Sequence, residues 1–526
     1  MRLDWLRLEK FKNLVDASID FDEDELTTVL IGANGSGKSN VIEALVTIFR
    51  DLDLEETTSF RYHISYTCYG NQIEINNNLG KRGISIKVNQ KVKSRADFFS
   101  EKTKYLPAHV FGYYSGSSRR LEFLFDKHQV KYYKRVISPE SKTEDIHDVE
   151  LRRLFYCRQS YGQLALLSYF AFGAHSAKTF LKRQFQITGF NSALLVLRKP
   201  RWANATPTEH QRTHGDPRFW YSSGLVRALL DKLWEFSLAP ISGTSREQDD
   251  YRTKPGGEDQ VYIFIKNQED LKQIAESFGD EKSFFSLLET LDISDLIRDV
   301  KIWVDKDKVN GEIPFHEISD GEKQLLSVLG LMRFTGREES LFLLDEPDTH
   351  LNPMWKWNYL NLINEVTSKN SESHIILTSH DPLTMGSLKA SQVQVMSISD
   401  KDKTIVSPPR VDPRGLGFTN ILTQIFGMPS TVDPDTQSKL DSRNALLRLE
   451  ERSDAQERSL FEINKKLKGL GFLLEDREEE YLLFLRAFED IKKDRFTVFS
   501  SEEIAARNEV AKKILAEITT RRSEAK

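Results

Sequence analysis

The order of apolar and polar positions along the chain predicts a mixed α/β protein. Short apolar runs separated by charges fill residues 1–31 and end in a β-branched run at 26–31, which is the spacing of strands. A Gly-rich turn follows, and apolar spacing then predicts a helix from Gly37 to about Phe49. From about residue 258 to 430, strand-like runs alternate with helical segments, as in an α/β sheet. These runs lie at 261–265, 299–304, 341–344, 375–378 and 393–398.

The other segments differ in character and indicate further parts. Residues 59–115 carry strand-like runs separated by Asn and Gly, which favour an antiparallel β subdomain. Residues 148–185 have helical spacing, and residues 186–260 are mixed. After about residue 431 the chain is rich in Glu, Lys, Arg and Leu at helical spacing. We expect a head at 1–430 and a helical region at 431–526 for assembly or partner binding; a simple helical cap on the head is the alternative.

Composition narrows the classes of function. The net charge of −5 argues against a protein that coats nucleic acid through bulk positive charge. Neither Cys68 nor Cys157 has a CxxC neighbour, which predicts reduced thiols rather than a zinc site or disulfides. No run of about 18 apolar residues occurs, so no membrane-spanning helix is expected. With no signal-peptide pattern at the start, the sequence predicts a soluble, cytoplasmic protein.

A phosphate-binding loop follows the β-branched run. Residues 32–39 (GANGSGKS) match G-x-x-x-x-G-K-[ST] between a predicted strand and a predicted helix. Glycines let successive backbone N–H groups point at phosphate oxygens, and the start of the helix adds its positive dipole. Lys38 would reach the β- and γ-phosphates, and Ser39 would bind Mg²⁺. We therefore expect ATP and Mg²⁺ as ligands. The expected nucleotide contacts are Asn34, Gly35, Ser36, Gly37, Lys38, Ser39 and Asn40.

A pair of acids ends a fully apolar strand. Residues 341–344 (LFLL) precede Asp345 and Glu346. α/β sheets bind ligands at the C-terminal edge of such strands. Asp345 would hold the Mg²⁺ through water, and Glu346 would act as general base on the attacking water. Successive strand residues face opposite ways, so the two acids can do different jobs only if the chain turns there, and Pro347 favours that turn.

Two weaker features complete the arrangement. Ser319-Asp320-Gly321-Glu322-Lys323 precedes a helical run and is typical of helix capping or anion binding. His380 follows the predicted strand at 375–378 and could donate a hydrogen bond to a γ-phosphate. An ordinary N-cap and a surface histidine are the alternatives.

In this order, the motifs resemble those of the ABC ATPase superfamily, and within it the SMC, RecF and OLD-like heads. SDGEK looks like the family's LSGGQ signature, LLDEPDTHLNP like its Walker B and D-loop, and LTSHD like its switch-histidine region. AAA+ ATPases share the phosphate loop and the acids but lack the signature helix. The resemblance implies an ABC-type P-loop NTPase head, with antiparallel β subdomain, inserted α+β segment and C-terminal helical region.

The resemblance also implies roles for single residues. Ser319 and Gly321 would contact ATP held by a second subunit, with Asp348 at the seam between the two heads. Gln159 and Gln163 are both candidates for the family's Q-loop glutamine, with a solvated helix glutamine as the alternative. Asp320 stands where glycine is common in the signature, so we expect ATP hydrolysis to be slow.

The long segment between Lys38 and Asp345 contains strands, Pro and Gly and no sustained heptads, so we expect a compact elaboration and no coiled-coil arm. The core would be residues 1–60 and 300–430, elaborated by 61–299. Residues 198–220 interleave arginines with aromatic residues, which suits flexible or single-stranded nucleic acid. A loop that packs its aromatic side chains and solvates its arginines is the alternative.

The layout resembles standalone ATPases of bacterial anti-phage defence, with the Septu-type ATPases, which work with an HNH nuclease, as the nearest match. It favours an ATPase that dimerises head to head on ATP, as a homodimer or a higher even oligomer, and regulates a separate nuclease or toxin. A RecF-like DNA-repair ATPase acting directly on DNA is the alternative. No nuclease motif is recognised, although an undetected nuclease in residues 187–300 is a third hypothesis.

Overall fold

The computed structural model describes most of the head and the start of the C-terminal region. The described residues are 1–22, 24–78, 83–136, 152–158, 160–173, 175–203, 206–246, 256–307, 312–335, 338–367, 373–399, 402–449 and 451–472. The chain forms two compact units, residues 1–428 and 429–526. Among the helices described, none is both long and apolar enough to cross a bilayer.

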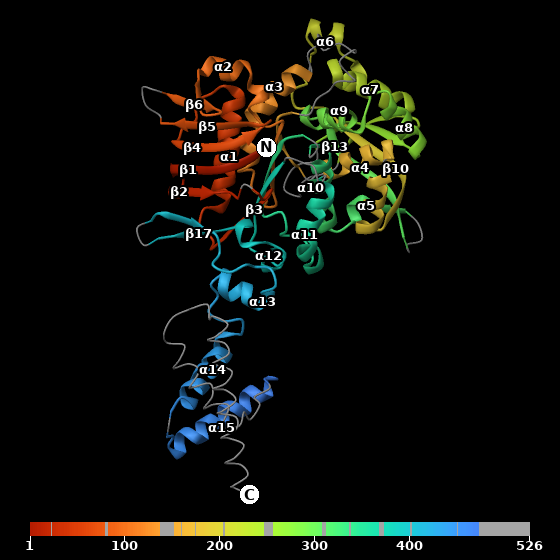
Figure 1. Cartoon of the computed structure of the whole chain (residues 1–526). Coiled ribbons are helices and arrows are strands. Elements are labelled where there is room, and N and C mark those ends of the chain that lie inside the picture. Colours follow the sequence, from red (N-terminus) through yellow and green to blue (C-terminus); the bar gives the residue numbers. More distant parts are fainter. Residues whose placement is uncertain are drawn as a thin grey trace. The chain divides into compact units, whose positions relative to one another are not determined.

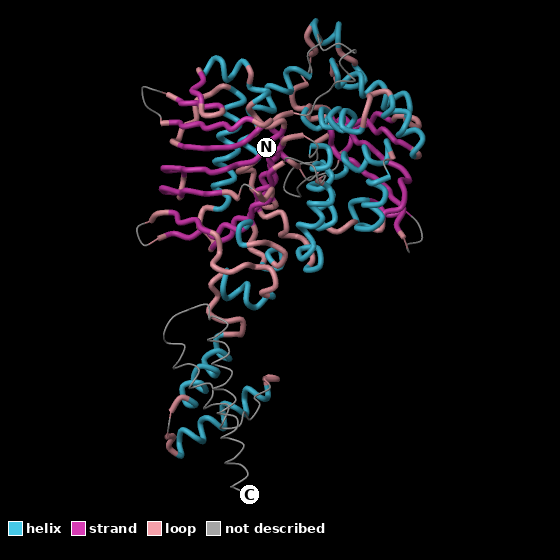
Figure 2. The backbone as a smooth tube through the Cα atoms, in the orientation of Figure 1, coloured by secondary structure: helices cyan, strands magenta, loops and turns pink. Residues whose placement is uncertain are grey.

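A seven-stranded sheet forms the centre of the first unit (Figures 1 and 2), in the order β18-β17-β3-β16-β15-β8-β9. All neighbours in it are parallel except β17 and β18. The inner strands are apolar on both faces and fully buried, as parallel strands are when other elements cover both sides. The strands are β3 (Thr27–Gly32), β8 (His109–Tyr114), β9 (Leu154–Tyr156), β15 (Ser340–Asp345), β16 (His374–Thr378), β17 (Val393–Ile398) and β18 (Thr404–Ser407).

Helix α1 (Lys38–Leu54) lies between the parallel sheet and a six-stranded antiparallel sheet. Its apolar residues share one core with both sheets, which explains why almost all of its length is buried. The antiparallel sheet has the order β2-β1-β4-β5-β6-β7 and corresponds to the predicted antiparallel subdomain. Its strands are β1 (Arg2–Phe11), β2 (Leu14–Asp20), β4 (Tyr62–Cys68), β5 (Asn71–Asn77), β6 (Ile84–Val88) and β7 (Lys91–Lys93), and α2 (Arg95–Ser100) follows them.

The inserted α+β segment contains a second antiparallel sheet, β11-β12-β10-β13-β14. Figure 1 shows β10, β13 and the helices α4, α5, α7, α8 and α9 on the side of the unit away from β1 and β2. Its strands are β10 (Ile187–Arg198), β11 (Ile241–Ser245), β12 (Glu258–Ile265), β13 (Ile297–Lys306) and β14 (Glu312–Pro314). The helices are α3 (Asp126–Val136), α4 (Tyr161–Phe172), α5 (His175–Phe185), α6 (Glu209–His214), α7 (Gly224–Phe236), α8 (Gln268–Glu276) and α9 (Glu281–Ile293).

Two strands of the central sheet come from the segment that we expected only to elaborate the core. Strands β8 and β9 lie beside β15, although residues 109–156 fall outside the predicted core ranges 1–60 and 300–430. The helical spacing predicted for 148–185 also misses β9, because three buried residues are too few to show a period. The remaining strand predictions within the head, from 261–265 to 393–398, are confirmed.

Helix α10 (Asp320–Thr335) joins the insertion to the central sheet. It packs against α4 on one side and α11 (Pro353–Val366) on another, and it leads directly into β15. The short helices α12 (Pro382–Met385) and α13 (Gly417–Asn420) complete the first unit. The described part of the second unit is a pair of contacting helices, α14 (Pro434–Leu447) and α15 (Asp454–Gly469), as the helical spacing of the tail predicts.

Candidate functional site

The Gly-rich loop of residues 32–37 connects β3 to α1 where the backbone must adopt conformations that only glycine tolerates. Gly32 has φ +150°, and a Cβ there would stand 2.2 Å from the carbonyl oxygen of Met396 on β17. Gly37 has φ +101°, and its Cβ would meet the Leu14 side chain at 2.4 Å. The loop is therefore held tightly between β17 and the β1–β2 turn, as a phosphate-binding loop requires.

Lys38 and Ser36 offer donors that fit a phosphate. The Lys38 ammonium is buried and donates to the carbonyl oxygens of Gly32 at 2.9 Å and Ala33 at 3.2 Å, so it folds back over its own loop. Burial lowers the pKa of Lys38, an effect opposed by the carboxylates of Glu346 and Asp345. The Ser36 hydroxyl is buried and has no hydrogen-bond partner among the residues that the structure describes. A buried polar atom without a partner is costly, and a phosphate oxygen would satisfy this one.

The two residues expected to bind the metal, Ser39 and Asp345, are in contact beside the loop. Ser39 Oγ donates to Asp345 Oδ1 at 2.9 Å, and Thr378 Oγ1 on β16 donates to the same oxygen at 2.7 Å. Hard oxygen ligands of this kind suit Mg²⁺, so the residues fit the ion that the sequence predicts. Thr378 was not anticipated, because only the pairing of β15 with β16 places it opposite Asp345.

Glu346 turns away from the strand that carries Asp345. Its φ is +53°, an unusual value for a side chain other than glycine, and its N–H donates to Thr378 Oγ1 at 2.9 Å. This is the turn that different roles for the two acids require. His380 Nε2 lies 3.2 Å from Glu346 Oε1, so the structure brings the two candidate catalytic residues together. Burial lowers the pKa of His380, with the Lys38 ammonium as the next cause.

Ser319 forms a capping box at the start of α10. Its hydroxyl and N–H both donate to Glu322 Oε2 at 2.9 Å, and it accepts from the Glu322 N–H at 3.3 Å. Ser319 and Asp320 are exposed, whereas Gly321 is buried against the carbonyl oxygen of His350, 2.8 Å from where its Cβ would be. The N-cap interpretation therefore holds for Ser319, and the residue also lies at the surface, where a second molecule can reach it.

Asp348 and Gln163 make contacts within their own chain. The resemblance implies instead a place at the seam between two heads for Asp348 and a Q-loop role for Gln163. The Asp348 side chain is 3% exposed and accepts from Ser379 Oγ at 2.6 Å and Thr384 Oγ1 at 2.7 Å within its own chain. Burial raises its pKa. Gln163 donates to the carbonyl oxygen of Val300 at 2.6 Å, which ties α4 to β13. Gln159 lies outside the described residues.

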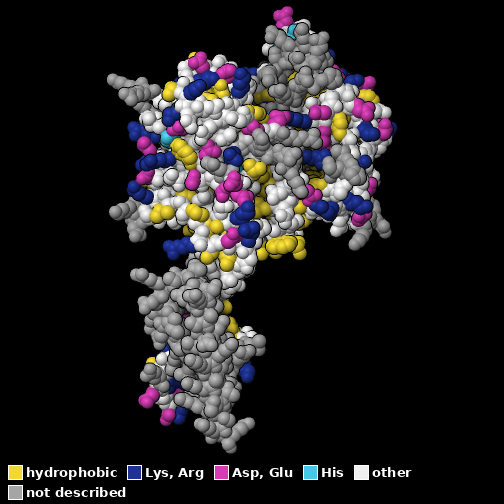
Figure 3. Space-filling view, in the orientation of Figure 1, with side chains coloured by type: hydrophobic (Ala, Val, Ile, Leu, Met, Phe, Trp, Pro, Cys, Tyr) yellow, Lys and Arg dark blue, Asp and Glu magenta, His cyan; other side chains and the backbone are white. Residues whose placement is uncertain are grey.

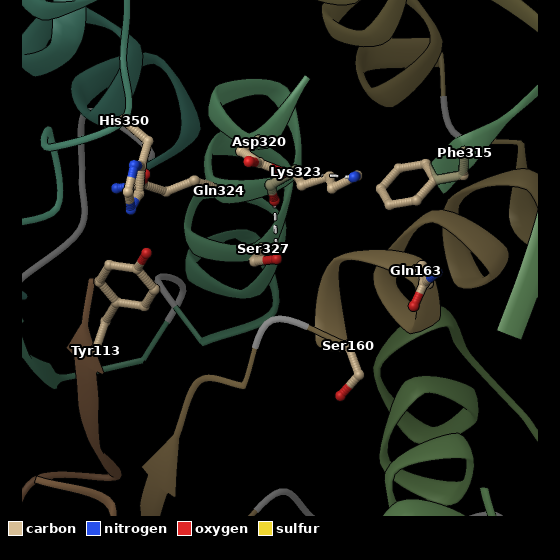
Figure 4. Close-up of a pocket in the computed structure, with 9 residues that line it drawn as sticks. All are labelled: Tyr113, Ser160, Gln163, Phe315, Asp320, Lys323, Gln324, Ser327 and His350. Carbon is tan, nitrogen blue, oxygen red and sulfur yellow. Dashed lines mark hydrogen bonds and ion pairs between the residues drawn. The ribbon is translucent and has the colours of Figure 1, made fainter. Parts of the chain in front are cut away.

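Gln163 faces a polar pocket of about 390 Å³ beside α10 and not the phosphate loop. In Figure 4, Tyr113 and His350 stand on one side of α10, and Lys323 extends toward Phe315 on the other. No residue of the loop at 32–39 lines this pocket. The lining residues are Tyr113, Ser160, Gln163, Phe315, Asp320, Lys323, Gln324, Ser327 and His350.

Sequence reasoning missed two residues that contact the loop and its acids, Asn13 and Arg120. Asn13, in the β1–β2 turn, donates to the carbonyl oxygen of Gly35 at 2.5 Å and accepts from Asn40 Nδ2 at 2.5 Å. Arg120 Nη2 pairs with Asp345 Oδ2 at 2.5 Å. Asn34 is exposed at the tip of the loop. Asn13 and Arg120 carry no motif, so only their positions in the fold could reveal them.

Two of the arginines in residues 198–220, Arg198 and Arg218, are engaged within the chain. Arg218 pairs with Asp216 and Asp231, both at 2.6 Å, and its guanidinium lies over the Trp234 ring. Arg198 pairs with Asp295, and Trp202 donates to the carbonyl oxygen of Ser294. On the face seen in Figure 3, basic and acidic side chains are interspersed. These contacts favour the packed-loop alternative over a nucleic-acid site.

Comparison with known proteins assigns the family. The profile described as "AAA domain, putative AbiEii toxin, Type IV TA system" matches residues 27–101 and 65–386, more than half of the chain. The chain belongs to this family. As a member of this AAA-domain family it is an ATPase of the AAA/ABC class, and its α/β fold with the phosphate loop between β3 and α1 fits that class.

Individual relatives match over parts of their length. Septu protein PtuA from Bacillus mycoides (strain KBAB4) is 21% identical over 39% of this chain and 29% of that protein. Septu protein PtuA from Bacillus thuringiensis is 30% identical over 24% of this chain and 35% of that protein. The matches thus span about a third of the length of these relatives.

Solved structures are more distant. The SMC head domain from Thermotoga maritima is 13% identical, with a TM-score of 0.32, over 78% of this chain and 100% of that chain. The recombination mediator RecF with ATP is 17% identical, with a TM-score of 0.27, over 77% and 97%.

The contact between His380 and Glu346 predicts a pH response in the nucleotide-free protein. We expect His380 to titrate below the ordinary histidine pKa, because burial and the Lys38 ammonium both disfavour the imidazolium. Lys38→Met should raise this pKa, and Glu346→Gln should lower it further, because one removes a positive and the other a negative charge. NMR titration of the imidazole carbons measures both, with His380→Gln for assignment and the exposed His210 as internal reference. Shifts of the same sign in the two variants would contradict this electrostatic account.

Proposed function

We propose that the protein hydrolyses ATP at two composite sites, each formed when two heads meet face to face. The observation that carries the proposal is the exposure of Ser319 at the start of α10. Among the described residues, its hydroxyl and N–H bond to Glu322 and its carbonyl oxygen accepts from the Lys323 N–H, and none of these bonds reaches the phosphate loop of its own chain. The positive dipole end of a helix suits an anion, and here the anion would be the γ-phosphate of ATP held by a second head, for which Ser319 would exchange its bonds to Glu322.

Each head contributes different groups to the reaction. The phosphate loop binds the phosphates through its backbone N–H groups, Lys38 and Ser36. Ser39 and Asp345 would hold Mg²⁺, which supplies charge neutralisation on the β- and γ-phosphates when bound. Glu346 accepts a proton from the attacking water, and His380, in contact with it, positions the base and the γ-phosphate.

The partner head completes the site through the exposed Ser319, whereas Gly321, which was expected to touch the same ATP, is buried and acts only through its own chain. Gly321 allows α10 to approach residues 347–350, because its Cβ would meet the His350 carbonyl. Asp348 supports this segment from within, since its carboxylate holds Ser379 and Thr384. Asp320 in place of a second glycine adds a negative charge near the incoming phosphates, and this favours slow turnover.

Glu346→Gln tests the general base. We expect the variant to bind ATP as tightly as the parent and to hydrolyse it at least about a hundredfold more slowly, because the amide keeps the shape but cannot accept the proton. Nucleotide binding and phosphate release measure the two effects separately. Glu322→Gln, which alters the capping box and leaves the acids intact, is the comparison. Unchanged turnover in Glu346→Gln would exclude the proposed role.

A mixture of two inactive variants tests whether the site is shared. Lys38→Ala removes the phosphate lysine, and Ser319→Arg blocks the start of α10. Each should be inactive alone, whereas an equal mixture should recover about a quarter of parent activity, since half of the randomly paired dimers contain one intact site. Ser319→Ala, which loses the cap without adding bulk, separates the effect of helix capping from that of blocking. Absence of recovery in demonstrated mixed dimers would argue for sites contained within one chain.

We further propose that this ATPase regulates a separate nuclease of the HNH type in anti-phage defence, acting in the cytoplasm. Similarity to two proteins named Septu protein PtuA supports the assignment. The helical C-terminal unit is the proposed docking region. The side chains of Phe461 and Leu470 in that unit are 67% and 58% exposed, whereas Leu460 and Leu467 are buried. Large apolar side chains that stay exposed are typical of an interaction surface.

Capture of tagged protein from its native cells tests the partner. We expect a stoichiometric protein with an HNH motif to be retained by the parent chain and lost from the double variant Phe461→Ser, Leu470→Ser. Val92→Ser, an exposed apolar position on β7, is the matched control and should retain it. Capture of the nuclease by the double variant would move the docking site elsewhere. Absence of any nuclease, with DNA-stimulated hydrolysis by pure protein, would favour a RecF-like role.

A further inference from the structure

Arg120 occupies the side of the Asp345 carboxylate that the serine and threonine leave free. Asp345 Oδ1 accepts from Ser39 and Thr378, and Oδ2 accepts from Arg120 Nη2 at 2.5 Å. The carboxylate is 2% exposed, so a resident positive charge compensates a buried negative one. Both oxygens that a hydrated metal ion would approach are therefore engaged.

Neighbouring contacts place Arg120 there, although its side chain is 37% exposed. The loop that carries it begins at Ser115, whose N–H donates to the carbonyl oxygen of Asp345 at 3.2 Å. It is fixed again at Glu122, which accepts from Arg119 at 2.7 Å and from Arg158 at 3.1 Å. The guanidinium itself lies 4.5 Å from the centre of the Tyr114 ring. Both ends of the loop and the side chain are thus positioned.

The contact between Arg120 and a second nearby acid, Glu43, is incomplete. Arg120 Nε lies 3.9 Å from Glu43 Oε1, too far for a hydrogen bond, and within the described part of the chain both atoms are buried without a hydrogen-bond partner. Glu43 lies on α1 one turn after Ser39. A guanidinium that satisfies one acid fully and the next only partly can be displaced more readily than one held on both sides.

We propose that Arg120 is a resident counter-ion that competes with Mg²⁺ for Asp345, so that nucleotide and metal can bind only after the guanidinium leaves. This rests on the proposed function, in which Asp345 and Ser39 hold the ion. Two cations cannot share one buried carboxylate at hydrogen-bond distance without strong repulsion. Arg120 is therefore a positioning residue that sets the Mg²⁺ concentration at which the head accepts ATP.

Mg²⁺ titrations of a fluorescent ATP analogue on the full chain test this proposal. Arg120→Gln should lower the Mg²⁺ concentration for half-maximal binding by about five- to tenfold, because the competing charge is removed. Arg61→Gln, which removes an exposed arginine paired with Glu9 on the antiparallel sheet, should leave the midpoint within about twofold of the parent. Without nucleotide, Mg²⁺ alone should raise the melting temperature of Arg120→Gln more than that of the parent chain.

The outcomes separate this proposal from the assignment of the metal site. Asp345→Asn with an unchanged Mg²⁺ requirement would overturn the metal site itself. An Asp345-dependent requirement with an equal or higher midpoint in Arg120→Gln would overturn only the competition. If Arg120→Gln does not fold, Arg120→Lys keeps a charge with poorer geometry and should give an intermediate midpoint. A midpoint at or above that of the parent in this variant would likewise overturn the proposal.

Discussion

The buried carboxylate of Asp345 is the interaction on which the rest of the site depends. A charge at this depth is tolerated only with partners, and each partner comes from a different part of the chain: Ser39 from α1, Thr378 from β16 and Arg120 from the loop after β8. The parallel pairing of β15 with β16 and β8 brings these partners together, because the carboxyl ends of neighbouring parallel strands meet at one edge of the sheet.

The same edge links the phosphate loop to the surface of α10. Gln324 donates to the carbonyl oxygen of Pro347, and Gly321 lies against that of His350, so the start of α10 is held beside the segment that follows the acids. The pocket next to it is lined by residues from β8, α4 and α10. The start of α10 and the segment after the acids are therefore in direct contact.

The insertion is part of the head and not an appendage. Its helices α4 and α9 share a hydrophobic core with α10 and with strands of the central sheet, and a buried ion pair between Arg152 and Glu289 joins the segment after β8 to α9. Removing either partner of such a pair leaves an uncompensated charge, so the insertion and the sheet must fold together. Arg198 and Arg218, which lie on the insertion, likewise pair with acids of the same region.

The sequence by itself determined the class of the protein and the position of its phosphate loop, because these depend on local residue types: glycines at fixed spacing, a lysine and a serine at a helix start, and two acids after an apolar strand. It also predicted the strands that are long enough to show a period. Only the tertiary structure decided which other side chains meet there. Thr378, Asn13 and Arg120 reach the site through strand pairing and loop closure between distant segments, and Asp348 is buried by the same packing. Such contacts follow from which strands become neighbours, and the periodicity of any single segment does not contain that information.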